Sequence, residues 1–200
     1  QAQAEANRCL YCYDAPCIKA CPTAINIPEF IRRIATGNYR GAGQTILEAN
    51  ILGFSCARVC PVEVLCVGSC VYNNMKAKPI EIGRLQRFAT DWAFDRNIRY
   101  FSKGPSTGKK VALIGAGPAS LACAAELAIA GHQAVLFEQN VFPGGLNTTG
   151  IAPYKIRSDA SLREVSWCIA ASLINPNLSQ SWPKLSRASA SRLLSKLSLP

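Results

Sequence analysis

The cysteines of the first 70 residues are the side chains most able to do chemistry. They form two groups, the first spaced C-x2-C-x4-C-x3-C and followed by proline, the second spaced C-x3-C-x5-C-x3-C. The groups consist of Cys9, Cys12, Cys17 and Cys21, and of Cys56, Cys60, Cys66 and Cys70. Eight of the ten cysteines therefore have ligand-like spacing, which favours iron–sulfur electron transfer.

Disulfides and zinc are the competing interpretations of these thiols. A C-x2-C disulfide closes a strained short loop, and the start of the sequence has no apolar signal-peptide core, so we expect a cytoplasmic protein with reduced thiols. Zinc sites favour paired C-x2-C knuckles, which the second group lacks. Cubane clusters accept wider spacings and often end in Cys-Pro, as Cys21-Pro22 does.

The Cys-Pro ending also predicts how two clusters would share the thiols. In the bacterial run that ends this way, the fourth cysteine serves the other cluster of a pair. The first cluster would then use Cys9, Cys12 and Cys17 with one thiol of the second group. Spacing alone leaves the remaining places open among Cys21, Cys56, Cys60, Cys66 and Cys70.

A second motif, GAGPAS at residues 115–120, has the pattern G-x-G-x-x-S. Gly115 allows a tight turn, and Gly117 lets the backbone approach a pyrophosphate at a helix N-terminus. Glu138, at the end of the next expected strand, is placed to accept a hydrogen bond from a ribose hydroxyl. The adjacent glycines Gly144 and Gly145 resemble the second flavin contact of reductases with two dinucleotide domains. An ordinary turn is the alternative interpretation of this pair. We therefore expect FAD to bind at Gly115, Gly117, Pro118, Ala119, Ser120, Glu138, Gly144, Gly145 and Leu146.

The elements that must position these residues follow from hydrophobic periodicity and from breaks at glycine and proline. Helices are expected within 28–52, with a break at 37–38, and over 79–97, whereas both cysteine groups read as loops. A strand at 110–115, a helix at 118–130 and a strand at 134–138 make a β-α-β unit.

The fold class expected is an all-α iron–sulfur domain, ferredoxin-like in function, followed by an incomplete α/β Rossmann-type FAD-binding domain. The expected domains are 1–101 for the clusters, 102–109 as a linker and 110–165 for the start of the flavin domain. Residues 166–200 read as a Ser-rich tail, disordered or shifted out of frame, because no glycine follows Gly150.

The composition limits the partners. The net charge of +10 indicates a solvated basic surface or a docking face for an acidic redox partner. We expect no nucleic acid, because no basic stripe is interleaved with aromatics. We expect no membrane, because no apolar run approaches the roughly 18 residues of a spanning helix.

The runs RCLYCYDAPCIKACP, CARVCPVEVLCVGSC and PIEIGRLQRFATD resemble the N-terminal cluster domain of dihydropyrimidine dehydrogenases. The resemblance is greatest to the FAD and iron–sulfur subunit of the bacterial NAD-dependent enzymes and covers about residues 8–165. The glutamate synthase small subunit carries a related domain. The resemblance implies two [4Fe–4S] clusters, one held by Cys9, Cys12, Cys17 and Cys70, the other by Cys21, Cys60, Cys66 and Gln86.

By the same resemblance Cys56 is not a ligand. Gln86 is an unusual ligand, because a glutamine on a helix is ordinarily a surface amide. The glutamate synthase domain has glutamate at that place, so Gln86 favours the dehydrogenases. A neutral ligand in place of a thiolate makes a cluster less negative and should raise its potential.

The resemblance implies that NAD(P)H reduces FAD and that electrons pass through the clusters to a catalytic large subunit, which reduces a pyrimidine. No residue is expected to act as a catalytic acid or base. A glutamate synthase-like reductase and a non-enzymatic cluster-binding fragment are the alternatives, the latter because the sequence has no second G-x-G-x-x-G. Whether the chain also forms a homo-oligomer is left open by the sequence.

Overall fold

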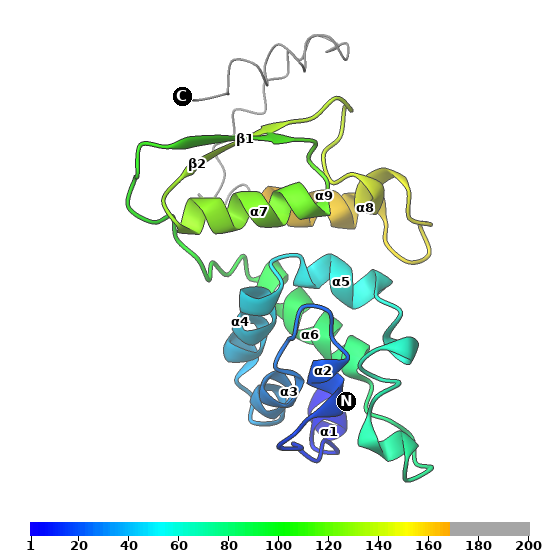
Figure 1. Ribbon diagram of the computed structural model, residues 1–200. Coiled ribbons are helices and arrows are strands. Elements are labelled where there is room, and N and C mark those ends of the chain that lie inside the picture. The colour runs from blue at the N-terminus through cyan, green and yellow to red at the C-terminus, as the bar shows by residue number, and fades with distance from the viewer. Residues whose placement is uncertain (169–200) are drawn as a thin grey trace.

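The computed structural model describes residues 1–168 and forms two parts, which Figure 1 shows one above the other. The expectations for the last residues of the tail fall on 169–200, outside the described chain. The helical part consists of α1 (Ala2–Ala6), α2 (Pro16–Lys19), α3 (Ile27–Ala35), α4 (Tyr39–Ala49), α5 (Gly53–Val59), the 3-10 helices η1 (Val62–Val64) and η2 (Val71–Asn73), and α6 (Ile82–Asp95). The sheet part consists of β1 (Lys110–Ile114), α7 (Pro118–Ile129), β2 (Gln133–Phe137), α8 (Leu146–Thr149) and α9 (Ser158–Cys168).

The helices α3 and α4 form where the sequence predicts them. The Asn26 side chain caps α3 by accepting a hydrogen bond from the Glu29 amide at 3.2 Å, and Pro28 stands in its first turn. The break between the helices is confirmed at Gly37, whose φ of +79° suits glycine. Asn38 then caps α4 through the Gly41 amide at 2.9 Å.

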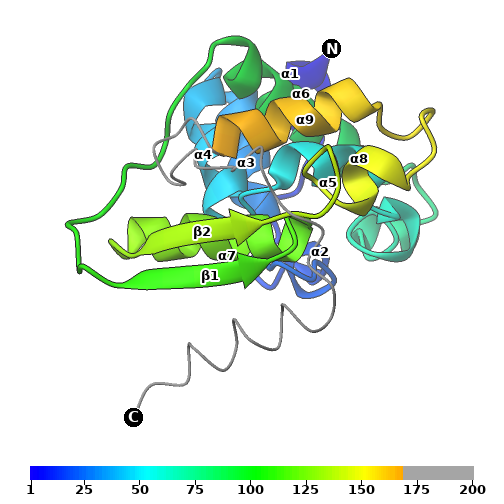
Figure 2. The ribbon, with the colours of Figure 1, turned by 90° about the horizontal axis from the view of Figure 1, so that it is seen from above.

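The β-α-β unit is also confirmed. The strands β1 and β2 pair in parallel, with Lys110 opposite Gln133 and Ile114 opposite Phe137. Between them, α7 packs against the sheet through small buried residues, which allow a close approach: Leu121, Ala124, Ala125 and Ala128. Helices α7 and α9 lie between the sheet and the helical part, as the views in Figures 1 and 2 show. Among the described helices, none is long and apolar enough to cross a bilayer.

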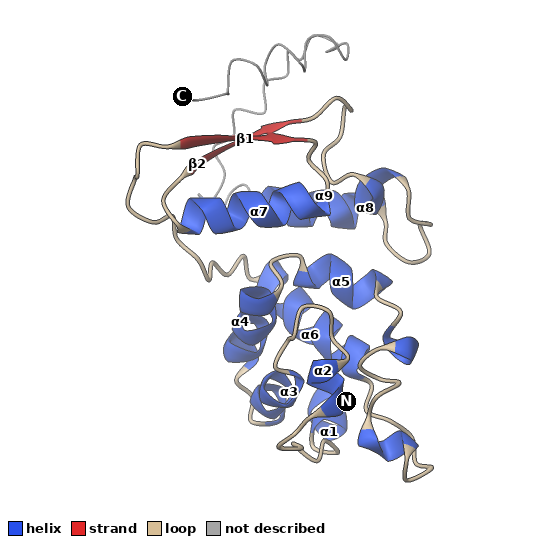
Figure 3. Cartoon of the chain, in the orientation of Figure 1, coloured by secondary structure: helices blue, strands red, loops and turns tan. Residues whose placement is uncertain are grey.

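Several helices depart from the sequence-based expectation, among them α2, which contains Cys17 of a cysteine group expected to be a loop. The region 56–70 was expected to be a loop, but its first residues, 56–59, belong to α5, which Figure 3 draws as a helix. Helix α5 is short, contains glycine and has no side-chain cap of its own, so its sequence carries little helical signal. Helix α9 was not expected either, and it continues to Cys168, so the expectation of a disordered tail is wrong for residues 166–168.

The two parts share a hydrophobic core. Three rings stack across the junction: Phe54 on Phe94 with centroids 4.5 Å apart, and Phe94 on Trp167 at 4.9 Å. Residues of α4, α5 and α6 pack in the same cluster as residues of α7, β2 and α9. The segment between the parts is also held, since Gly104 donates to the Ala128 carbonyl at 3.1 Å.

A buried carboxylate completes the junction. Glu164 of α9 is 2% exposed and accepts hydrogen bonds from the amides of Phe54 at 3.0 Å and Ser55 at 3.1 Å. Burial raises the pKa of Glu164 to about 7, although these hydrogen bonds and the charge of Arg58 oppose the shift. The nearby Cys168 thiol is buried on the same helix, and its own pKa is raised by burial and by Glu164.

The stability of the chain should therefore fall as the pH rises from about 4.5 to about 7. The pKa of Glu164 is about 7 in the folded chain against an ordinary 4.5, so the folded state holds this proton more tightly. Its contribution to the free energy of unfolding is complete below pH 4.5 and is lost as the pH rises through the folded pKa, by about 3 kcal/mol. Thermal unfolding of the unaltered chain and of Glu164→Gln across this range should show the glutamine variant gaining in relative stability. A difference that does not change with pH would refute this assignment.

Candidate functional site

Four thiols from both sequence groups converge on one small cavity. The cavity has a volume of about 30 Å³, and its thiol lining consists of Cys9, Cys12, Cys17 and Cys70. The first two come from the loop after α1, Cys17 from α2, and Cys70 from the residue before η2. The remaining lining is largely apolar and includes Ile27, Ile31 and Ile80. The chain thus brings the last cysteine of the second group to the first three of the other.

The cavity thiols are electrostatically crowded. The pKa of Cys17 is raised to about 11, mainly by burial and to a smaller extent by the neighbouring Cys9 and Cys70. Burial also raises the pKa of Cys9, with Cys12 and Cys70 adding to the effect. Such thiols become thiolates readily only beside a compensating positive charge, which bound iron supplies.

A second set of thiols gathers around α5. Burial raises the pKa of Cys66 to about 12, and the nearby thiols of Cys60 and Cys21 add to the shift. Burial and Cys60 likewise raise the pKa of Cys56 to about 11, with a smaller effect of Cys21. Cys21 therefore lies with the thiols of the second sequence group, although it belongs to the first group by its position in the sequence. We refer to the four thiols that line the first cavity as the first set and to Cys21, Cys56, Cys60 and Cys66 as the second set.

Gln86 lies beside the second set and is buried. The side chain extends from α6 with 6% of the residue exposed, and its Nε2 donates to the Gly53 carbonyl at 3.1 Å. The amide also hydrogen-bonds the Cys56 thiol and lowers its pKa, against the larger effect of burial. The ordinary surface position of a helical glutamine is thus not the one that this residue adopts. Cys56 belongs to the second set and Gln86 lies beside it, so either residue can be considered as the ligand that joins Cys21, Cys60 and Cys66.

The donor sets fit clusters better than single ions. All the described cysteines are free of disulfides. Within residues 1–168, no three His, Cys, Asp or Glu side chains are close enough to hold one metal ion. Ligands of one tetrahedral zinc lie within about 4 Å of each other, whereas a cubane binds each thiolate at a different iron and needs a wider set.

Removing the Cys56 thiol tests which residue completes the second set. If Gln86 is the ligand, Cys56→Ala should keep about eight irons per chain, because each of two [4Fe–4S] clusters retains four ligands. Iron and acid-labile sulfide analysis of the anaerobically purified chain measures this. Gln86→Ala, assayed in parallel, should lose iron or alter the spectrum of one cluster. Loss of about four irons from Cys56→Ala alone would assign the ligand to Cys56 instead.

The glycine motif forms an open backbone surface at the start of α7. Gly115 has a φ of +87°, and a Cβ added at Gly115 or Gly117 would meet no atom within 4 Å. The second glycine pair packs against the first, since Gly144 donates to the Ala116 carbonyl at 2.8 Å and a Cβ on Gly145 would lie 3.0 Å from the Gly117 Cα. The two loops therefore form one surface, which fits the close approach of a pyrophosphate.

Glu138 ties this surface to the second strand. Its carboxylate accepts from the Ala116 amide at 2.7 Å and from the Asn140 amide at 2.8 Å. Burial tends to raise its pKa, but these hydrogen bonds outweigh burial and hold the pKa below the ordinary range. The remaining expected contacts frame the same surface. They are Pro118, Ala119 and Ser120 in the first turn of α7, and Leu146, which begins α8 and is exposed.

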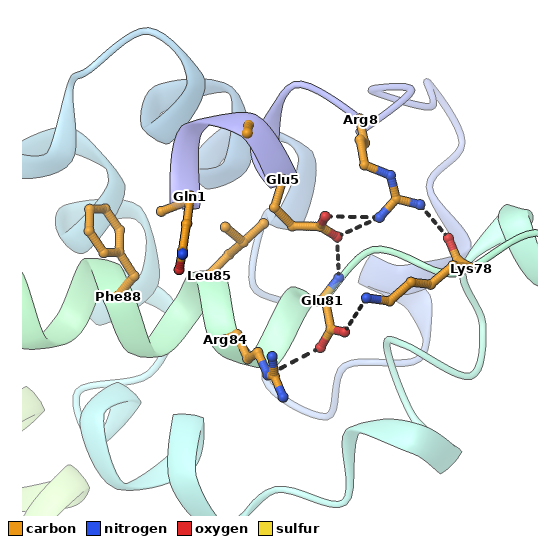
Figure 4. Close-up of a pocket in the computed structure, with 10 residues that line it drawn as sticks. Gln1, Glu5, Arg8, Lys78, Glu81, Arg84, Leu85 and Phe88 are labelled. Atoms are coloured by element: carbon orange, nitrogen blue, oxygen red, sulfur yellow. Dashed lines mark hydrogen bonds and ion pairs between the residues drawn. The ribbon is translucent and has the colours of Figure 1, made fainter.

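A larger open cavity of about 840 Å³ lies between α1 and α6 (Figure 4). Its charged side chains pair with each other, as Arg8 with Glu5 at 2.8 Å and Lys78 with Glu81 at 3.0 Å. Arg84 also pairs with Glu81. The lining contains no cysteine, so the cavity is not itself a thiol site.

Both parts of the chain match known protein families. Residues 1–98 match the sequence model described as dihydropyrimidine dehydrogenase domain II, 4Fe-4S cluster, and residues 113–160 match an NAD(P)-binding Rossmann-like domain. The chain is 45% identical over 152 residues to the NAD-dependent dihydropyrimidine dehydrogenase subunit PreT of Escherichia coli K12, covering 76% of this chain and 37% of that protein.

Two further relatives give the same picture. The PreT homologue of Salmonella typhi is 42% identical over 162 residues, covering 81% of this chain and 39% of the homologue. The glutamate synthase [NADPH] small chain of Escherichia coli K12 is 40% identical over 164 residues, covering 82% and 34%. The aligned region thus spans little more than a third of each relative. Residues 1–98 belong to the dihydropyrimidine dehydrogenase domain II family of 4Fe-4S domains, and the chain is a relative of NAD-dependent dihydropyrimidine dehydrogenase subunits and of the glutamate synthase small chain.

Proposed function

We propose that the chain is the cluster-bearing and flavin-binding portion of an electron-transfer oxidoreductase component. Electrons would pass from NAD(P)H through FAD and two [4Fe–4S] clusters to a partner that reduces a pyrimidine. The observation that carries the proposal is the convergence of Cys9, Cys12, Cys17 and Cys70 on one cavity. No acid or base catalyst is assigned, because the residues' task is to bind cofactors and to set their surroundings.

Each thiol set would hold one cluster. The first would be bound by the four cysteines of the cavity, and the apolar walls there would exclude water. The second would be bound by Cys21, Cys60, Cys66 and Gln86, with Cys56 close by but not ligating. A neutral amide among the ligands leaves the second cluster less negative, and this should raise its potential.

The open glycine surface would receive the pyrophosphate of FAD. Gly117 presents backbone without a side chain at the start of α7, and Glu138 stands at the end of β2, where ribose hydroxyls bind in this kind of domain. Bound FAD would supply the conversion of a two-electron hydride into single electrons. Because α5 contacts α9 of the sheet part, the second set is the one joined directly to the flavin-binding part.

The acceptor is proposed from the relatives. Those named as dihydropyrimidine dehydrogenase subunits favour a catalytic large subunit that reduces a pyrimidine, and the net charge of +10 suits an acidic redox partner. A cytoplasmic location follows from the reduced thiols that clusters require. A glutamate synthase-like role is the second candidate, favoured by the small chain at 40% identity.

Cofactor analysis of the purified chain tests the proposal. The anaerobically prepared chain should contain about eight irons and an equal amount of acid-labile sulfide, and it should show flavin absorbance. Pyridine-nucleotide oxidation with an artificial acceptor then tests electron entry. If the chain contains iron and sulfide but no flavin, the flavin part of the proposal is wrong and the chain is a cluster-binding fragment. Co-purification of an amidotransferase-containing subunit, in place of a pyrimidine-reducing one, would favour the glutamate synthase role.

A further inference from the structure

Helix α5 is held at its start by a residue from the other part of the chain. The first amides of a helix have no partner within the helix, and α5 has no side-chain cap of its own. Glu164 of α9 takes that place: one carboxylate oxygen accepts from the Phe54 amide at 3.0 Å and the Ser55 amide at 3.1 Å, and the other lies 3.2 Å from the Ser55 amide. Because the contact is buried, water cannot replace it.

The same first turn also holds Gln86. The Gln86 amide donates to the carbonyl of Gly53, the residue just before Phe54. One turn further on, α5 carries Cys56, and it ends at Val59, directly before Cys60. A shift of this turn would therefore move two residues proposed as ligands of the second cluster, Gln86 and Cys60.

Helix α9 is held in place by contacts other than those of Glu164. Trp167 stacks on Phe94, and its indole Nε1 donates to the Ile98 carbonyl at 3.1 Å. The Arg99 guanidinium in turn donates to the Trp167 carbonyl at 2.9 Å. Helix α9 is thus fixed to α6 and to the segment after it, independently of Glu164.

We propose that Glu164 is a positioning residue that holds the first turn of α5 against α9 and thereby sets the geometry of the second cluster's ligands. The inference rests on the proposed function, because it requires a cluster at the second thiol set. It adds to that function a residue of the flavin-binding part that acts on the cluster through hydrogen bonds to the backbone.

The geometry points to the reach of the side chain, and not its charge, as the property that matters. Its partners are neutral backbone amides, which any well-placed oxygen can satisfy. Arg58, whose charge acts on Glu164, already has its own partner in Asp91 and stacks on the Phe54 ring. Glu164→Asp keeps the charge but shortens the reach by one methylene, whereas Glu164→Gln keeps the reach and removes the charge.

The experiment compares these two variants in the full chain with its clusters. Asp95→Asn is the matched control, because it breaks the exposed Arg163–Asp95 pair, which also joins the two parts but makes no hydrogen bond to the backbone of α5. Iron content is measured first, and electron paramagnetic resonance of the reduced chain and a potentiometric titration follow. The second cluster's signal is identified as the one absent from Cys66→Ala.

We expect Glu164→Asp to keep its iron and to change the second cluster's signal alone. Its reduction equilibrium should shift at least threefold, which is about 28 mV at 59 mV per tenfold for one electron. Glu164→Gln and Asp95→Asn should match the unaltered chain. Should Glu164→Asp lose its iron, Glu164→Leu, which fills similar space without an acceptor, takes its place with the same expectation.

Three results would overturn the inference. A shift in Glu164→Gln without one in Glu164→Asp would mean that charge acts in place of position. Unchanged signals in every Glu164 variant would leave the residue a stability role only. Equal changes in both clusters would show a general loosening of the fold. An unaltered chain without iron would instead overturn the proposed function, on which the inference depends.

Discussion

Replacing Cys70 with alanine is expected to remove the same cluster as replacing Cys17, although 52 residues lie between these two cysteines in the chain. Both thiols line the first cavity, so each variant should retain about four of about eight irons per chain. Iron and sulfide analysis measures the loss. The paramagnetic signal of the reduced chain shows which cluster remains, and it should be the same in both variants.

Cys66→Ala is the matched control, since Cys66 belongs to the same sequence group as Cys70 but to the second set. It should also lose about four irons and should leave the other signal. Combining Cys17→Ala with Cys70→Ala should cost no more iron than either change alone, because both thiols serve one cluster. If Cys70→Ala instead matched Cys66→Ala, the interleaving of the two groups would be wrong.

Placing valine at Gly117 is expected to abolish flavin binding without unfolding the chain. A Cβ at this position would meet no atom within 4 Å, so the fold has room for the side chain. The added methyl groups would instead occupy the space proposed for the pyrophosphate, which needs a close approach to the backbone. Flavin content should fall at least about tenfold, which corresponds to about 1.4 kcal/mol of binding free energy, with little change in melting temperature.

Gly131→Ala provides the contrast. Gly131 has a φ of +85°, and an added Cβ would lie 1.9 Å from the Pro105 carbonyl oxygen, so this change should lower the melting temperature as well. Absorbance of the flavin released from the purified chain, compared with thermal unfolding, separates the two effects. Normal flavin content in Gly117→Val would place the cofactor elsewhere or exclude it.

The sequence predicts best the elements that carry their own local signals. Helix α3 has an asparagine cap, a proline in the first turn and one apolar face, and all three signals agree. Strands β1 and β2 are short β-branched or apolar runs on either side of a glycine turn and a helix. These elements were therefore predicted to within a few residues.

Helices α5 and α9 were missed because they depend on each other. The start of α5 is stabilised by Glu164, a residue 109 positions beyond Ser55, and no local pattern reports such a contact. Helix α9 is polar apart from the residues buried at the junction, among them Val165 and Trp167. Its hydrophobic face becomes evident only once Phe94 is in place against it.

Cysteine spacing alone predicted the thiol sets only in part, for a related reason. Spacing shows which cysteines are neighbours along the chain and suggested that Cys21 crosses to the other cluster. It leaves the rest of the second group open. The fold supplies what is missing, because Cys70 lies at the cavity of the first set, whereas Cys66 lies beside Cys60 and Cys21.

The stacked rings at the junction have a consequence for how the molecule unfolds. Phe54 and Phe94 belong to the helical part, but Trp167 of the sheet part stacks on Phe94, so neither part buries its apolar surface alone. Separate modules joined by a passive linker would melt in two steps. This chain should instead melt in a single cooperative transition. Cleavage within residues 96–109 should then leave the halves associated, and only denaturant should part them.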